Sequence, residues 1–338
     1  MPLLSVLDQS PISDGATPAQ AIHETIELAK LADRLGYHRY WMAEHHSSDG
    51  LGGSAPEILT ARVAADTQGI RVGSGGVMLS HYSPLKVAET FRLLETLYPG
   101  RIDLGIGRAP GSDQRTASVL AYGNPPRGPR EYPGQVRDLI DFLHGDLPAD
   151  HHFAGLQASP LGDGMPEIWM LGSSDQSAQM AAYFGTPFSF AHFITDEGGT
   201  EVMQEYRDGY RPSIDHPTAR GNIGAFVICA ETEAEAQRLA LSRDLWRTRL
   251  DTGHIGPVPT IEEAANYDYS AIETQRRDYH RRRNIIGDPD QVKRGLEDLM
   301  TRYGIDEIVI VTITHDYVAR RRSYELIAEA FGLAGRSI

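Results

Sequence analysis

Acidic and imidazole side chains gather directly after one short apolar segment. Residues 41–46 read Trp-Met-Ala-Glu-His-His, which places Glu44, His45 and His46 where a strand candidate ends. The charge of an imidazole changes near neutral pH, so this position favours a functional role for the histidines over a packing role. Zinc is the alternative, because His and carboxylate are common ligands. Neither a His-x-His after the first strand candidate nor a late Asp–His set completes such a site, so we expect no metal.

Glycine clusters follow the next two strand candidates. Residues 72–78 read Val-Gly-Ser-Gly-Gly-Val-Met, and glycines there permit unusual φ values and a close approach of the backbone to a flat ligand. A turn is the alternative interpretation of this stretch. Residues 105–111 read Gly-Ile-Gly-Arg-Ala-Pro-Gly, a spacing that misses the dinucleotide-binding fingerprint. Arg108 in this second cluster is a fixed cation that could bind a phosphate.

A serine cluster opens the helix candidate after the fifth strand. Gly172, Ser173 and Ser174 come at the end of that strand, and Ser177 lies in the first turn of the helix. Hydroxyl groups and free N–H groups at a helix N-terminus form an anion site, whereas helix capping accounts for only one of the hydroxyls. Because Arg108 follows the neighbouring strand, the two clusters together predict a ligand that carries a phosphate.

Short apolar strand candidates alternate with amphipathic helix candidates. The fold that these elements form must bring the glycine, serine and histidine clusters to their places. The pattern predicts one (β/α)8 TIM-barrel domain spanning residues 1–338, with polar excursions at 145–166, before the fifth strand, and at 251–283, before the eighth. An open doubly wound sheet is the alternative. In a barrel, the residues that follow the strands meet at the C-terminal mouth, where active sites lie. The strand candidates are residues 3–7, 39–43, 70–73, 102–106, 168–171, 188–191, 223–230 and 307–312.

The composition is that of a globular protein with an acidic surface. Lys and Arg number 32 against 46 Asp and Glu, and the net charge of −14 argues against non-specific binding to nucleic acid or acidic membranes. No apolar run approaches the roughly 18 residues of a membrane span, and the first residues lack a secretory signal. We therefore expect a cytoplasmic protein. Cys229, the single cysteine, excludes an intrachain disulfide and is expected to lie in a buried strand.

Taken in order, these stretches resemble the luciferase-like flavin monooxygenases. The resemblance spans nearly the whole chain and is strongest between Leu35 and Gly111. Each segment alone is common, but the combination is specific, and residues 7–11, 79–87 and 101–111 resemble a bacterial subgroup that includes antibiotic-pathway oxygenases. The strongest segments are Gly36-Tyr37, residues 41–46, residues 72–76, and Pro99-Gly100-Arg101 leading into residues 105–108.

The resemblance implies a barrel, usually a homodimer, that binds reduced FMN across its mouth. It assigns His45 as the catalytic histidine and implies a non-prolyl cis peptide between Gly75 and Gly76, beneath the flavin. It also implies that Arg108, Ser174 and Ser177 contact the FMN phosphate. The implied cofactor-binding set is Gly75, Gly76, Arg108, Gly172, Ser173, Ser174 and Ser177.

The chain also departs from bacterial luciferase at three places. Gly107 stands where the luciferase α subunit carries a reactive cysteine, and Ser173 stands where that subunit has a glutamate. Residues 251–283 do not closely resemble the mobile segment that covers the luciferase flavin. Light emission is therefore not expected, and neither the lid nor the substrate can be transferred from luciferase.

The reaction implied by the resemblance starts from reduced FMN and O2, which form a C4a-hydroperoxyflavin that oxygenates a small organic substrate. His45 would hydrogen-bond or exchange a proton there, a role that suits a group titrating near neutrality. The absence of a nicotinamide fingerprint indicates that a separate flavin reductase supplies the reduced FMN. The expected substrate pocket draws on Met78, His81, Phe190 and His192.

Two other functions are compatible with the same sequence. One is hydride transfer by the deazaflavin F420 on the same scaffold. The other is a non-catalytic flavin-binding protein, against which His45 argues.

Overall fold

Parallel strands close into a ring in the computed structural model, which describes residues 2–109, 111, 113–122, 130–254 and 256–336. Each strand of the ring pairs with the next in chain order, and the last pairs with the first, so the predicted (β/α)8 barrel is confirmed. The ring strands are β1 (Leu3–Asp8), β2 (Arg39–Met42), β3 (Arg71–Met78), β4 (Ile102–Gly107), β5 (Glu167–Gly172), β6 (Phe188–Phe190), β7 (Gly221–Cys229) and β9 (Glu307–Val311).

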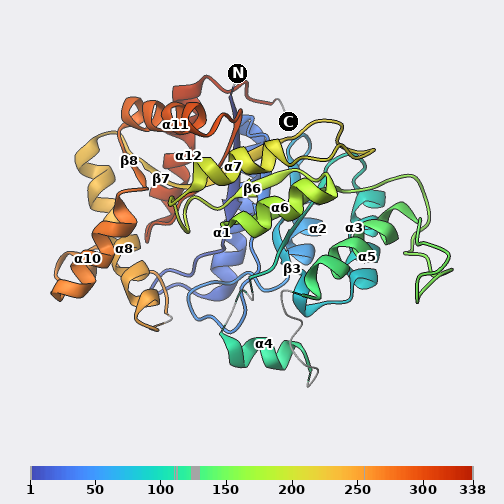
Figure 1. The fold of residues 1–338 in the computed structure, drawn as a ribbon. Coiled ribbons are helices and arrows are strands. Elements are labelled where there is room, and N and C mark those ends of the chain that lie inside the picture. Colours follow the sequence, from blue (N-terminus) through green and yellow to red (C-terminus); the bar gives the residue numbers. More distant parts are fainter. Residues whose placement is uncertain (1, 110, 112, 123–129, 255, 337–338) are drawn as a thin grey trace.

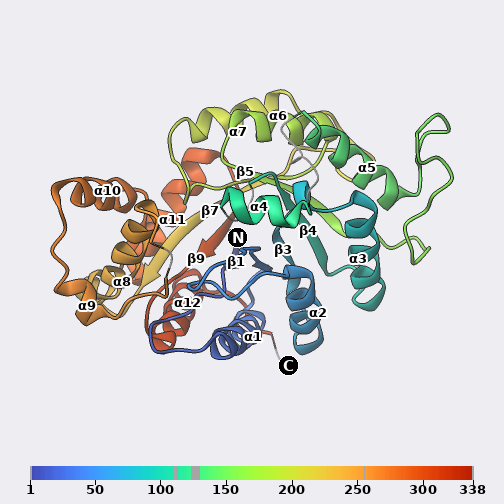
Figure 2. The ribbon, with the colours of Figure 1, turned by 90° about the horizontal axis from the view of Figure 1, so that it is seen from below.

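Helices surround the ring on its outer face (Figures 1 and 2). Their ends follow the local sequence: Thr17 caps the first helix by accepting a hydrogen bond from the Gln20 amide at 3.2 Å, and Gly36 ends it at φ 89°. None of the helices among the described residues is long and apolar enough to cross a membrane. The helices of the outer layer are α1 (Pro18–Leu35), α2 (Pro56–Asp66), α3 (Pro84–Leu97), α5 (Tyr132–His144), α6 (Asp175–Phe184), α7 (Gly199–Asp208), α8 (Glu233–Asp251), α11 (Pro289–Tyr303) and α12 (Tyr317–Phe331).

The two excursions lie where the sequence predicts them. Residues 145–166 contain neither helix nor strand, and residues 251–283 contain the short helices α9 (Ile261–Ala265) and α10 (Ala271–Arg281). The second excursion leads into β8 (Ile285–Gly287), a strand that the sequence pattern does not predict. It pairs only with β7 and therefore lies outside the ring.

Two further short elements were not predicted. The 3-10 turn η1 (Leu79–His81) follows β3 directly, and the helix α4 (Gln114–Leu120) lies between β4 and α5. Figures 1 and 2 show α4 at the end of the barrel where the ring strands end. It thus lies beside the mouth.

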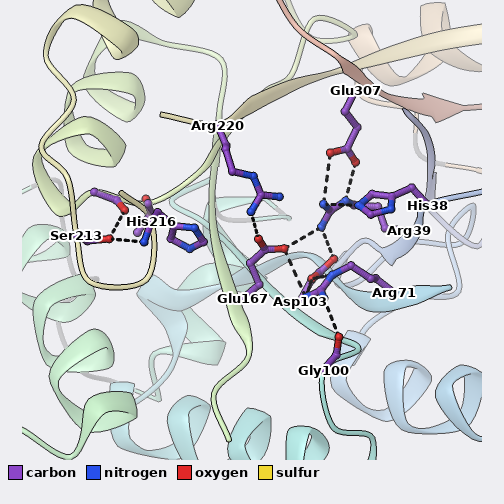
Figure 3. Close-up of polar contacts among 12 residues, drawn as sticks. His38, Arg39, Arg71, Gly100, Asp103, Glu167, Ser213, His216, Arg220 and Glu307 are labelled. Carbon is purple, nitrogen blue, oxygen red and sulfur yellow. Dashed lines mark hydrogen bonds and ion pairs between the residues drawn. The ribbon is translucent and has the colours of Figure 1, made fainter. Parts of the chain in front are cut away.

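An ion-pair network closes the opposite end of the barrel (Figure 3). The buried Arg39 guanidinium lies at the start of β2, with its Nη1 2.6 Å from Asp103 Oδ2 and its Nε 2.6 Å from Glu307 Oε1. Its Nη1 is also 3.4 Å from Oε2 of Glu167, which Arg220 contacts from the outside. Because these residues come from the first halves of several ring strands, the network ties the strands together at one end and leaves the other end free.

Two tryptophans fill the barrel above this network. The indole rings of Trp41 and Trp169 meet edge to face with centroids 5.3 Å apart, and the Arg39 guanidinium lies 4.6 Å from the Trp169 ring centre. Trp41 Nε1 donates to Asp103 Oδ2 at 2.9 Å. Among the described residues, the barrel is therefore packed up to the level of Trp41, and its open end is the mouth.

Candidate active site

A cavity of about 380 Å³ lies at the mouth, directly above Trp41. This volume is in the usual range for small-molecule sites. Its walls are mainly apolar, and polar groups are concentrated near Arg108 and the start of α6. The side chains and glycines that bound it include Leu7, Gln9, Trp41, Ala43, His45, Gly75, Gly76, Met78, Gly107, Arg108, Leu171, Gly172, Ser173, Ser174, Ser177, Ser189, Ala191, Phe193, Ile194 and Val309.

His45 lies on the wall of this cavity. Its backbone N–H donates to the Gly53 carbonyl at 2.8 Å, which fixes the chain after β2. Its Nδ1 atom is buried and has no hydrogen-bond partner among the described residues. Burial, with a smaller contribution from His46, lowers the pKa of His45 to about 4. The expectation of a group that titrates near neutrality is therefore wrong for this chain: the free imidazole is neutral at neutral pH.

Glu44 and His46 face away from His45. The buried Glu44 carboxylate accepts hydrogen bonds from Tyr82 Oη at 2.7 Å and from the Met78 N–H at 2.9 Å, and it lies 2.7 Å from His46 Nε2. Successive residues of an extended chain point to opposite sides, so the Glu-His-His run does not converge on one ion. Within the described ranges, no group of three or more His, Cys, Asp or Glu side chains is placed to hold a metal. Glu44, whose role the sequence did not reveal, connects the ends of β2 and β3.

Gly75 and Gly76 bring the backbone against the cavity. The peptide bond between them is cis, as the resemblance implies. A Cβ atom on Gly75 would lie 2.7 Å from Leu7 Cδ1, and one on Gly76 would lie 2.6 Å from Leu171 Cδ1. The glycines do not form a turn: β3 continues to Met78, with a shift in its pairing to β4 between Gly75 and Val77. Only glycine leaves this surface flat.

Arg108 and the serines meet at the polar side of the cavity. Arg108 Nη1 donates to Gln176 Oε1 in the first turn of α6 at 2.9 Å. Ser174 caps α6 by accepting from the Ser177 N–H at 3.4 Å, and the two hydroxyl oxygens are 3.2 Å apart. At Gly172 a Cβ atom would lie 2.3 Å from Ser177 Oγ, so glycine is needed for β5 to approach the helix start.

Arg108 keeps its charge available. Its hydrogen-bond acceptor is a neutral amide, and it makes no ion pair with any described residue. The residues outside the described ranges include no Asp or Glu. The guanidinium, the hydroxyls and the N-terminus of α6 therefore lie together in an arrangement suited to an anion, and we call this group the anion-binding corner.

Of the predicted substrate-pocket residues, Met78 borders the cavity but Phe190 and His192 do not. Both are buried on the outer side of the strand end, where His192 Nδ1 lies 2.9 Å from Tyr303 Oη and the Phe190 ring lies 6.0 Å from the Tyr303 ring. This placement corrects the prediction. Successive residues of an extended chain point to opposite sides, so Phe190 and His192 face outward and the residues next to them face the cavity. The inward set is Ser189, Ala191 and Phe193.

His81 also lies off the cavity wall. It ends η1 on the rim, with its ring centre 6.3 Å from that of His46 and 6.2 Å from that of Tyr82. The turn η1 after β3 carries it outward. Gln9, which follows β1 directly, also borders the cavity, and no motif marks it as a site residue.

This arrangement fits a flat, largely apolar ring that carries a phosphate on a polar chain. A ring can lie against Gly75 and Gly76, and a phosphate can reach Arg108 and the serine hydroxyls. The unpartnered Nδ1 of His45 provides one hydrogen-bonding group on the wall.

Comparison with known proteins gives a consistent result. The model of the luciferase-like monooxygenase family matches residues 3–307. The protein YceB of Bacillus subtilis (strain 168) is 46% identical over 328 residues, covering 97% of this chain and 99% of its own length. The N-acetyl-S-alkylcysteine monooxygenase of the same organism is 38% identical over 336 residues, with coverages of 98% and 99%. The crystal structure of apo-MsnO8 superposes with a TM-score of 0.89 at 40% identity and covers 99% of this chain and 100% of its own.

Two more distant structures share the fold alone. The oxygenating constituent of 3,6-diketocamphane monooxygenase from Pseudomonas putida, in complex with FMN, has a TM-score of 0.70 at 20% identity, with coverages of 100% and 100%. An F420-dependent secondary alcohol dehydrogenase, in complex with an F420–acetone adduct, has a TM-score of 0.69 at 14% identity, with coverages of 97% and 98%.

Proposed function

The chain belongs to the luciferase-like monooxygenase family, and on that premise we propose that it is the oxygenase of a two-component, FMN-dependent system. It would take up FMN that a separate flavin reductase has reduced, and use O2 to oxygenate a small organic substrate. One observation carries this proposal: the mouth cavity combines a flat glycine surface, an anion-binding corner at Arg108, and the imidazole of His45 on the wall between apolar side chains.

Different residues would contact different parts of the cofactor. Gly75 and Gly76 would support the flavin ring, while Arg108, Ser174 and Ser177 would hold the phosphate, with Gly172 and Ser173 beside them. Reduced FMN, when bound, supplies the electrons that activate O2. The protein supplies position and a dry environment, because the apolar walls exclude water from the reacting atoms.

His45 would act on protons at the cavity wall. Its neutral imidazole can donate from one ring nitrogen and accept at the other, so it can hold a proton near an oxygen atom without carrying a charge. Met78 and Phe193 border the remaining space, which would be left for the organic substrate.

Of the two cofactors, we favour FMN over F420 for this chain. A relative with 38% identity over nearly the whole chain is named as a monooxygenase, whereas the F420-dependent structure is 14% identical and shares only the fold. The absorption spectrum of the bound chromophore separates the two cofactors, and the rate at which O2 oxidises the bound flavin separates an oxygenase from a non-catalytic flavin-binding protein.

Exposed apolar side chains support the proposal of a homodimer. Ile58 on α2 and Leu93 and Leu97 on α3 are 67%, 52% and 57% exposed. The two helices lie side by side on the outer layer in both views (Figures 1 and 2). Exposed apolar side chains on neighbouring helices are available for contact with a second copy of the chain.

The source of electrons gives the first test. We expect the purified chain alone to oxidise NADH or NADPH very slowly, because no Gly-x-Gly-x-x-Gly segment follows a strand. Adding a flavin reductase and FMN should start oxygen transfer to an organic substrate that depends on this chain. Because free reduced FMN consumes O2 by itself, the readout is the oxygenated product, with the reductase and FMN alone as the control. Rapid NADPH oxidation by the chain alone would contradict the two-component arrangement.

The phosphate corner gives the second test. Riboflavin keeps the ring and ribityl chain of FMN but lacks the phosphate, so its affinity should be weaker by about 2–4 kcal/mol, given about 1.5–3 kcal/mol for each charged hydrogen bond and incomplete additivity. Arg108→Ala should weaken FMN binding and leave riboflavin binding nearly unchanged. Anaerobic titration of both reduced flavins measures the four affinities. Equal losses for FMN and riboflavin would show that Arg108 only supports the loop.

A further inference from the structure

A second hollow of about 670 Å³ lies on the outer layer between α5 and α6. The two helices run next to each other in Figures 1 and 2. This α5–α6 groove shares Arg108 with the mouth cavity, so the anion-binding corner opens into both. Its lining residues are Arg108, Arg130, Pro133, Gly134, Arg137, Gln176, Gln179, Met180, Tyr183 and Phe184.

Positive charge is concentrated along this groove although the whole chain carries −14. Arg108, Arg130 and Arg137 all border it, and none of them forms an ion pair with the described residues. No Asp or Glu occurs in the remaining, undescribed positions. Guanidinium groups that form no ion pair remain available to bind phosphates.

The far end of the groove presents an aromatic platform. Tyr183 is 45% exposed, and the Arg211 guanidinium lies 4.5 Å from its ring centre. Arg137 Nη2 donates to Tyr183 Oη at 3.0 Å. A planar base can stack on such a ring and its flanking guanidinium groups.

The spacing along α6 suits a ligand that extends from the flavin phosphate. Gln176 contacts Arg108 near the first turn, and Tyr183 lies seven residues further along the same helix. At 1.5 Å per residue, the distance along the helix is about 10 Å, which leaves room for a second phosphate and a ribose between the corner and the ring.

We propose that the α5–α6 groove binds the adenylate half of a flavin dinucleotide, so that the protein accepts reduced FAD as well as reduced FMN. The second phosphate would lie near Arg130 and Arg137, and the adenine would stack on Tyr183. This proposal rests on the proposed function, because the flavin half must occupy the mouth cavity with its phosphate at Arg108.

The test compares two reduced flavins on one protein. Anaerobic calorimetric titration of the full chain with reduced FMN and reduced FAD gives the affinity ratio without any turnover. The variants are Arg137→Gln and Tyr183→Ala, both at exposed positions on the outer layer. Arg294→Gln on α11 is the matched control, because it removes an exposed arginine far from the groove.

We expect the wild type to bind reduced FAD about tenfold more tightly than reduced FMN, as one added charged hydrogen bond would give. Arg137→Gln and Tyr183→Ala should each abolish most of this preference and leave FMN affinity unchanged, while Arg294→Gln keeps the wild-type ratio. Weaker binding of FAD than of FMN by the wild type, or a ratio that both groove variants retain, would overturn the proposal. Failure of both flavins to bind would overturn the proposed function as well.

Discussion

Turnover should fall by about 10²- to 10⁴-fold when His45 is replaced by Ala, the usual contribution of a general acid–base group. The reason is that His45 provides the imidazole on the cavity wall, with a buried Nδ1 that no described residue satisfies. Steady-state rates with saturating reduced FMN measure the effect. Flavin affinity should change much less than turnover, because in the proposed binding mode Arg108 and the serine hydroxyls would hold the other end of the cofactor.

Two further variants define what His45 does. His45→Asn keeps a hydrogen-bonding side chain and should recover part of the rate if a hydrogen bond is the main contribution. His23→Ala, which removes an exposed histidine on α1, is the control and should behave as wild type. Wild-type turnover in His45→Ala would show that the imidazole has only a structural role.

The pH profile gives an independent readout of the same residue. Since burial lowers the pKa of His45 to about 4, its protonation should affect kcat/KM only below about pH 5. An ordinary surface histidine would produce this change in kcat/KM near pH 6.5. The change is assigned to His45 if it disappears in His45→Asn.

The second large effect concerns folding. Arg39→Ala should lower the free energy of unfolding by about 3–5 kcal/mol, because removing one partner of a buried ion pair leaves uncompensated charge. Here the buried carboxylate of Asp103 and those of Glu307 and Glu167 would lose their shared cation. Urea denaturation followed by circular dichroism measures the change through the midpoint and slope. Reduced FMN should still bind the fraction that remains folded, because the network lies at the end opposite the cavity.

Arg220→Gln is the matched control for this prediction. Arg220 contacts the same Glu167 carboxylate at 2.5 Å, but its side chain is 45% exposed. An exposed ion pair contributes about 0–1 kcal/mol, so this variant should be nearly as stable as wild type. A similar small loss for Arg39→Ala would contradict the role given to the buried network.

Acid should weaken the same network. Burial by itself would raise the pKa of Glu167, but the neighbouring arginines, Arg39 first, lower it to about 2 in the folded protein. The unfolded chain therefore binds this proton more strongly, and the stabilisation present above about pH 4.5 is lost as the pH falls towards 2. In Arg39→Ala the main cation is absent, so stability should depend less on pH across this interval.

The order of the ring strands could be predicted because each has its own apolar run and leads to a helix. The strand β8 (Ile285–Gly287) could not be predicted, because three residues carry no periodic pattern. It lies outside the ring and pairs with β7. The helix α4 is similarly short and contains no buried residue, so no amphipathic stripe marks it.

The positions of the candidate site residues could be predicted best where these residues follow strands in ordered motifs. Arg108, Ser174 and Ser177 meet as the neighbouring strands require, and Gly75 and Gly76 lie on the cavity wall. Phe190 and His192 were assigned to the wrong side because a sequence does not show which residue of a short strand faces inward. The lowered pKa of His45 could not be predicted either, since it depends on burial by segments distant in the chain.

The separation of the barrel into a closed end and an open end bears on how such proteins diverge. The residues that fix strand alignment, with Arg39 at their centre, lie at the starts of the strands, and the charged members of the network do not border the mouth cavity. Substitutions in the mouth loops can therefore accumulate under selection for a new substrate without eroding the stability that keeps the protein above its folding threshold. A barrel of this design is a scaffold on which specificity can change quickly while the architecture is inherited intact.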